Sequence, residues 1–169
     1  MEKLSYTQVR AMAEDGDIVL FHGSWRNPVN AITMFVTDSR LSHAGVVFWY
    51  QGAEEKRLLL LESRWPHRQI VTFSVYDDEW RKFELIKAPK PWSEVVDVAI
   101  EKTSDHKYSF LEFCWIGVRY LSQKWFNVVL PKLGLKSEVC SETVAMIYGI
   151  TDEEITPQQL YNKLNGKLQ

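Results

Sequence analysis

The chain is organised around the stretch Ser42-His43-Ala44-Gly45-Val46-Val47, in which a histidine opens a run of small and β-branched residues. Such a run is typical of a buried strand. A histidine at the start of a strand is held by the sheet while its ring can still face a cleft, where it can accept and return a proton. His43 is therefore a candidate general base, and the alternative is a structural histidine near a turn.

Two further segments supply the partners that such a histidine needs. Glu62 closes the run Leu58-Leu59-Leu60-Leu61, and Cys140 opens an expected helix within Val139-Cys140-Ser141-Glu142. A carboxylate beside the imidazole would fix its tautomer. The dipole and free N–H groups of a helix N-terminus favour a thiolate and could hold an oxyanion. The alternative for Glu62 is an ordinary charge at a strand end, paired with Arg64. The alternative for Cys140 is a small buried core residue.

The composition predicts one globular domain over residues 1–169. Hydrophobic residues make up 46% of the chain and aromatic residues 13%, which is ample for a packed core. The 20 Lys and Arg nearly balance the 22 Asp and Glu, and a net charge of −2 lacks the basic field of nucleic-acid-binding proteins. We therefore expect no nucleic-acid partner.

The cysteine count and the N-terminus bear on where the protein is found. Two cysteines, Cys114 and Cys140, exclude a disulfide-dense scaffold and indicate a reducing compartment. Residues 1–6 lack the apolar segment of a signal peptide, and the longest uncharged run, 41–53, is too short to span a bilayer. We expect a cytoplasmic protein without a transmembrane segment, although release by lysis would leave no mark on the sequence.

Strand-like runs precede helical patterns along the chain, and this order predicts an α+β fold with a small antiparallel sheet packed against helices. The expected strands are 17–21, 44–50, 57–61, 69–75 and 82–86, and the expected helices are 7–14, 27–35, 93–103, 109–129, 140–148 and one from Pro157 capped by Thr156. Apolar residues recur in the long helix with the spacing of a core-facing stripe: Phe110, Cys114, Val118, Leu121, Trp125 and Val128. This stripe predicts that Cys114 is inert packing.

Other residue types carry weaker signals. His22, His67 and His106 lie in polar or Gly/Pro-containing neighbourhoods without a comparable strand context. Trp25 and Trp65 fall in expected loops beside the candidate segments and could line a substrate cleft, whereas most of the seven tryptophans are expected to pack internally. The cysteines are far apart and there is no glycine-rich phosphate loop, so we expect neither a metal site nor a cofactor.

The order of these segments resembles the circularly permuted NlpC-type papain-like cysteine peptidases and amidases, the YiiX/YebB-like group. The similarity covers about residues 16–160. It is carried by Gly16-Asp17-Ile18-Val19-Leu20-Phe21, Thr37-Asp38-Ser39-Arg40-Leu41-Ser42-His43-Ala44-Gly45-Val46-Val47, Leu61-Glu62-Ser63, Tyr108, Val139-Cys140-Ser141-Glu142-Thr143 and Ile155-Thr156-Pro157. In that group the histidine precedes the cysteine, as it does in this chain.

The resemblance implies a permuted papain-like fold in which Cys140 is the nucleophile, His43 the general base and acid, and Glu62 the residue that orients the histidine. It also implies a supporting role for Tyr108 and hydrolysis of an amide bond in a peptide or a peptidoglycan fragment. A more distant similarity, to lecithin retinol acyltransferase-like proteins, implies acyl transfer or amide hydrolysis on a lipid as an alternative. The remaining alternative is a scaffold without catalysis that binds a cell-wall fragment or a protein.

Overall fold

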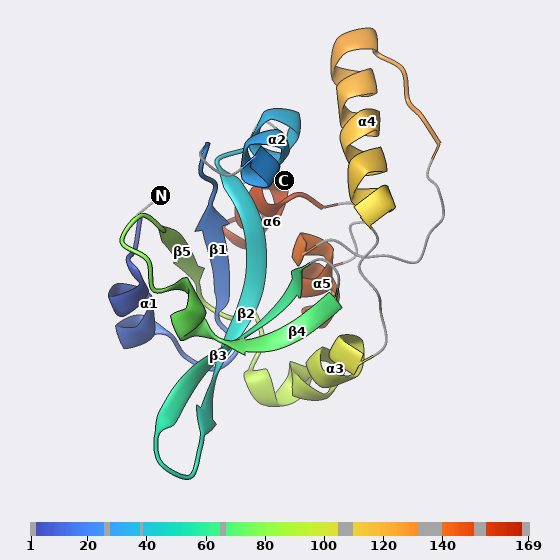
Figure 1. The fold of residues 1–169 in the computed structure, drawn as a ribbon. Helices are drawn as coiled ribbons and strands as arrows, with labels where there is room; N and C mark the ends of the chain where they lie inside the picture. The colour runs from blue at the N-terminus through green and yellow to red at the C-terminus, as the bar shows by residue number, and fades with distance from the viewer. Residues whose placement is uncertain are drawn as a thin grey trace.

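The structure, a computed structural model, describes residues 3–25, 28–37, 39–64, 67–104, 110–131, 140–150 and 155–166. Within these ranges the chain forms a mixed α+β fold around a five-stranded antiparallel sheet with strand order β4-β3-β2-β1-β5 (Figure 1). The elements in chain order are α1 (Tyr6–Met12), β1 (Ile18–His22), α2 (Pro28–Thr37), β2 (Leu41–Gln51), β3 (Lys56–Arg64), β4 (His67–Thr72), the 3-10 turn η1 (Phe73–Tyr76), β5 (Phe83–Ile86), α3 (Trp92–Ser104), α4 (Phe110–Phe126), α5 (Cys140–Ile147) and α6 (Pro157–Leu164).

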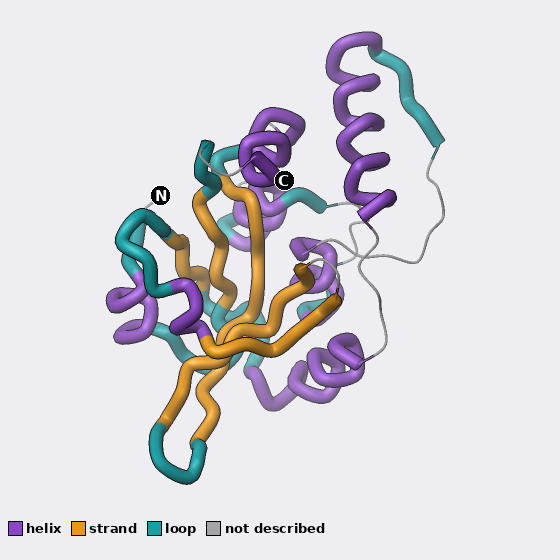
Figure 2. The backbone as a smooth tube through the Cα atoms, in the orientation of Figure 1, coloured by secondary structure: helices purple, strands orange, loops and turns teal. Residues whose placement is uncertain are grey.

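The centre of the sheet is the long hairpin of β2 and β3, whose strands run together before they diverge (Figure 2). Gly45 of β2 lies directly opposite Glu62 of β3, and Phe21 of β1 lies opposite His43 of β2. Two residues separate β3 from β4, and the resulting register places Glu62 opposite Gln69. The register therefore brings polar residues from three strands to one part of the sheet.

Buried apolar residues form two clusters, one on each face of the sheet. They are separate because successive side chains along a strand point to opposite faces. The first cluster joins the sheet to α3, α5 and α6, and it includes Leu20, Val46, Ala99, Val144 and Leu160. The second joins the sheet to α1 and η1, and it includes Val9, Val19, Leu60, Phe73 and Tyr76. Helices or turns thus cover both faces of the sheet.

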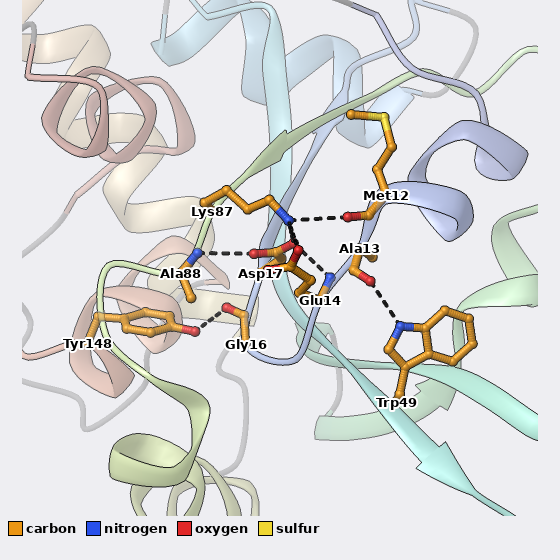
Figure 3. Close-up of polar contacts among 9 residues, drawn as sticks. All are labelled: Met12, Ala13, Glu14, Gly16, Asp17, Trp49, Lys87, Ala88 and Tyr148. Atoms are coloured by element: carbon orange, nitrogen blue, oxygen red, sulfur yellow. Dashed lines mark hydrogen bonds and ion pairs between the residues drawn. The ribbon is translucent and has the colours of Figure 1, made fainter.

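The turn that leads into β1 is fixed by a buried carboxylate, Asp17 (Figure 3). Its two oxygens accept the backbone N–H groups of Glu14 at 2.9 Å and Ala88 at 3.1 Å, and one of them also accepts from Lys87 Nζ at 3.1 Å. These contacts hold the start of β1 against the end of β5. Tyr148, just after α5, donates its hydroxyl proton to the carbonyl of Gly16, so the same turn is joined to α5.

The helices and strands of the described residues lie in the expected order, but several boundaries differ and part of one expected strand is a 3-10 turn. β2 begins at Leu41 and β3 runs to Arg64, so His43 and Glu62 lie inside strands and do not open or close them. The strand expected over 69–75 ends at Thr72, where the chain turns into η1. These shifts matter because they move both candidate residues into the hydrogen-bonded part of the sheet.

The long helix departs furthest from its expected packing. α4 ends at Phe126, three residues before the expected end, and Asn127 follows with a φ of 54°, the left-handed conformation that stops a helix. α4 packs against α2, and in Figure 1 it stands away from the sheet. Val118, Trp125 and Val128 are exposed, so the prediction of a core-facing stripe is wrong for these residues. The side chain of Cys114 lies outside the described residues.

Candidate functional site

His43 and Glu62 form a direct contact between adjacent strands. His43 Nε2 lies 2.7 Å from Glu62 Oε2, the Glu62 side chain is fully buried, and 19% of the His43 side chain is exposed. The imidazole also packs against the ring of Phe21 in an edge-to-face arrangement, with centroids 5.0 Å apart. The ring is therefore fixed on one side by a carboxylate and an aromatic contact, while part of it faces outward.

Glu62 is held by two further side chains. Gln69 Nε2 donates to Oε1 at 2.8 Å, and the Tyr76 hydroxyl lies 2.6 Å from Oε1 and 2.7 Å from Oε2. Arg64 Nη1 in turn donates to the Tyr76 oxygen at 3.3 Å. Arg64 thus contacts Tyr76, and the carboxylate of Glu62 is bonded to His43, Gln69 and Tyr76.

These contacts keep Glu62 ionised. Burial alone would raise the pKa of Glu62, but the hydrogen bond and charge of His43, with the hydrogen bonds of Tyr76 and Gln69, lower it to about 2. Burial also raises the pKa of Tyr76, and its bond to Glu62 raises that pKa further, which keeps the hydroxyl proton in place. Glu62 therefore carries a negative charge beside the histidine at neutral pH.

Cys140, the first residue of α5, also contacts His43. Burial acts to lower the pKa of His43, but the charge and hydrogen bond of Cys140 and then those of Glu62 outweigh burial and raise it to about 10. His43 thus lies between the thiol of Cys140 and the carboxylate of Glu62. Since Nε2 faces Glu62, Nδ1 is the ring nitrogen left for the sulfur. The arrangement is a hydrogen-bonded chain of thiol, imidazole and carboxylate.

The position of Cys140 follows from the way α5 is anchored. Ser141 is fully buried and donates its hydroxyl proton to the carbonyl of Ile155, which fixes the first turn of the helix. At the other end Gly149 adopts a φ of 67°, and Ile150 N–H donates to the carbonyl of Ala145 at 2.7 Å, a Schellman-type ending. Both ends of α5 are thereby fixed, so the first residue has a defined place beside β2.

Gly45 allows the strands that carry His43 and Glu62 to approach closely. A Cβ atom at this position would lie 2.7 Å from Leu60 Cδ1 and 2.8 Å from the carbonyl oxygen of Leu61. The second of these is a backbone atom, which cannot move aside without a shift of the strand. The packing of β2 on β3 thus requires glycine at position 45, two residues after His43.

The residues Cys140, His43 and Glu62, which the sequence singles out as catalytic candidates, come together. Trp25 is exposed, and Trp65 and Tyr108 lie outside the described residues. Sequence reasoning missed Gln69 and Tyr76. A two-residue connection after Arg64 would have paired position 62 with position 69. The strand expected over 69–75 covered most of η1, so the turn that places Tyr76 was not foreseen.

A second histidine–carboxylate pair lies elsewhere in the sheet. His22 ends β1, and its Nε2 lies 3.0 Å from Oε1 of Glu84 on β5, with both side chains nearly buried. The expectation that His22 lacks a strand context is therefore wrong, and His67 also lies in a strand. Burial lowers the pKa of His22, which the bond to Glu84 only partly offsets. The two pairs differ in one respect. Cys140 raises the pKa of His43, whereas no thiol acts on the pKa of His22.

The sequence matches no protein-family model and no curated protein. Among the described residues, no group of three His, Cys, Asp or Glu side chains is arranged to hold a metal ion. In the same part of the chain, no helix has the length and apolar character that crossing a bilayer requires.

Proposed function

We propose that the protein is a thiol-dependent amidohydrolase that cleaves an amide bond in a peptide or a peptidoglycan-derived fragment through an acyl-enzyme on Cys140. The observation that carries this proposal is the chain of contacts from the Cys140 thiol through His43 to the buried carboxylate of Glu62. A thiol beside an imidazole that a third group orients is the arrangement used for nucleophilic catalysis by cysteine.

The proposed reaction begins with an ion pair of thiolate and imidazolium. The Cys140 sulfur attacks the carbonyl carbon of the amide, and backbone N–H groups at the start of α5 stabilise the oxyanion. His43 then gives its proton to the leaving amine as the C–N bond breaks, which leaves a thioester. Water adds to the thioester while His43 accepts a proton, and the carboxylic acid departs as the thiolate and imidazolium are restored.

Glu62 has a positioning role in this scheme. Its hydrogen bond to Nε2 directs Nδ1 toward the sulfur, and its negative charge stabilises the imidazolium. Tyr76 and Gln69 would keep the carboxylate in place and ionised. No cofactor takes part in the scheme.

We further propose that the α+β fold is a permuted papain-like fold. Two observations support this proposal: the histidine and carboxylate come from adjacent strands, and the cysteine opens a helix that follows them in the chain. The peptide substrate class rests on the resemblance of the short motifs around these residues.

The test is incubation of purified wild-type protein with muropeptides and short peptides that contain D-glutamate, followed by mass spectrometry of the products. We expect cleavage by the wild type and by the Cys114→Ala control, and a loss of at least 1,000-fold in Cys140→Ala. The thioester intermediate should add the mass of the acyl fragment to Cys140 at short times. Equal cleavage by wild type and Cys140→Ala would refute the proposal.

A further inference from the structure

The end of α4 and the segment after it form a projecting hairpin. Trp115 Nε1 donates to the carbonyl of Pro131 at 2.9 Å, and Arg119 Nε donates to that of Leu130 at 2.9 Å. The chain after Asn127 therefore runs back along the helix, as Figure 1 shows for the segment that descends beside α4. We call residues 110–131 the α4 hairpin.

The turn of the α4 hairpin carries large apolar side chains in solvent. Phe126 and Val129 are each 72% exposed, and Trp125 and Val128 are also exposed. These four residues form the tip patch. Phe35 of α2, itself exposed, extends the patch because its ring lies 6.1 Å from that of Trp125. A group of large apolar side chains exposed together typically marks a site that binds a membrane or another protein.

The pattern of α4 gives a second reason to expect an apolar partner. Its apolar residues have the spacing of a stripe that a globular protein buries, yet the fold leaves Val118 and Trp125 of that stripe in solvent. The stripe thus continues into the tip patch. An amphipathic helix whose apolar side meets solvent is typical of a segment that lies at an interface.

The charges around the tip patch select among possible partners. Residues 118–131 contain Arg119 and Lys124 and no Asp or Glu, and residues 28–37 of α2 contain no charged residue, although the whole chain has a net charge of −2. The sequence of the tip is therefore aromatic with an excess of positive charge, whereas the whole chain has a small net negative charge. Trp and Phe favour the headgroup boundary of a bilayer, and Lys and Arg favour anionic lipids.

We propose that the tip patch of the α4 hairpin binds the surface of an anionic phospholipid bilayer, with Trp125 and Phe126 inserted at the headgroup boundary and Lys124 facing the lipid phosphates. The hairpin would thereby hold the domain at a membrane without spanning it. This binding is independent of the chemistry proposed for Cys140, because the tip patch and the thiol belong to different elements.

The experiment is co-sedimentation of the full chain with vesicles of phosphatidylcholine and phosphatidylglycerol in a 7:3 ratio, compared with vesicles of phosphatidylcholine alone. The test variant is Trp125→Ala/Phe126→Ala. The matched control is Trp80→Ala, which removes an indole that is 70% exposed and lies before β5. Far-UV circular dichroism and the alkylation rate of Cys140 show that each variant is folded.

We expect wild type and Trp80→Ala to bind the anionic vesicles and the double variant to bind at least tenfold more weakly. Lys124→Glu should reduce binding to the anionic vesicles, and added salt should reduce wild-type binding. Three results would overturn the proposal: no vesicle binding by the wild type, equal binding by the double variant, or a wild-type dimer that the double variant abolishes while neither form binds vesicles. The last result would assign the patch to a second copy of the chain.

Discussion

His43 and Glu62 are 19 residues apart in the chain, yet Nε2 of one lies 2.7 Å from Oε2 of the other. The contact follows from the antiparallel register of β2 and β3, in which Gly45 faces Glu62 and His43 lies two residues before Gly45 on the same strand. A charge without solvent, such as that of Glu62, is stable in a fold only when polar partners surround it. The site is thus a consequence of strand register, and its charges make it sensitive to pH.

The first prediction concerns acid unfolding. In the folded state His43, Tyr76 and Gln69 hold the pKa of Glu62 at about 2 against its ordinary value of 4.5, although burial opposes them. A carboxyl with a lowered folded-state pKa contributes stability that is present above its unfolded value and is lost as the pH falls through the folded value. The free energy of unfolding should therefore decrease between pH 4.5 and pH 2.

Urea unfolding of wild type and Glu62→Gln at several pH values checks this prediction. The wild type should lose stability with a steeper slope over that pH window, because the variant has no carboxyl at this position to protonate. Parallel slopes for the two proteins would show that Glu62 is not held ionised by its neighbours.

The second prediction concerns the protonation of His43. The charge of Cys140 is the largest of the effects that raise the pKa of His43 to about 10, and burial works against them. NMR titration of the histidine rings should find this imidazole protonated at pH 8. Cys140→Ser should lower its pKa, because the serine hydroxyl carries no charge, whereas Cys114→Ser should leave it unchanged.

The sign of the linked stability is the reverse of that for Glu62. A histidine with a raised folded-state pKa contributes stability that is complete below its ordinary value of 6.5 and is lost as the pH rises through about 10. Titration of His43 near 6.5 in the wild type would contradict the contact with Cys140.

The third prediction isolates Tyr76. Tyr76→Phe removes the hydroxyl that contacts both oxygens of Glu62 and leaves a buried carboxylate with one donor fewer. We expect a loss of about 1–3 kcal/mol in the free energy of unfolding and slower alkylation of Cys140 at neutral pH. Tyr50→Phe, which alters an exposed tyrosine, is the matched control. If the two variants behave alike, Tyr76 does not position Glu62.

The fourth prediction concerns Gly45. Gly45→Ala places a methyl group against the backbone of Leu61 and should shift β2 away from β3. We expect destabilisation of about 1–3 kcal/mol and a weaker contact between His43 and Glu62. Chemical unfolding gives the first quantity and NMR of the His43 ring the second. An unchanged His43 titration would show that the close approach of the strands does not set this contact.

The sequence was most informative where local structure decides the position of a residue. His43 and Cys140 could be chosen because a β-branched run and a helix start are visible locally, and Thr156 forms the expected helix cap with Gln159. Tyr76 could not be chosen in the same way. It meets Glu62 only because the chain leaves β4 after Thr72 and turns back, and this turn has no marked sequence signal.

The error at α4 has a different physical cause. The spacing of Val118 and Trp125 shows that one side of the helix is apolar, but not whether the rest of the fold is near enough to cover it. Helix type was therefore predicted correctly, whereas burial, which depends on tertiary placement, was not. The same apolar spacing along a helix is compatible with burial in the core and with an interface on the surface.

The central claim, an activated pair of Cys140 and His43, is tested most directly by iodoacetamide alkylation against pH, with peptide mapping to separate Cys140 from Cys114 and with His43→Ala as a variant. We predict rapid labelling of Cys140 well below pH 8, a rate that falls sharply in His43→Ala, and slow labelling of Cys114 in both proteins. Slow labelling of Cys140 that rises only near pH 8 and is the same in His43→Ala would contradict the claim and favour a binding scaffold with an unreactive thiol.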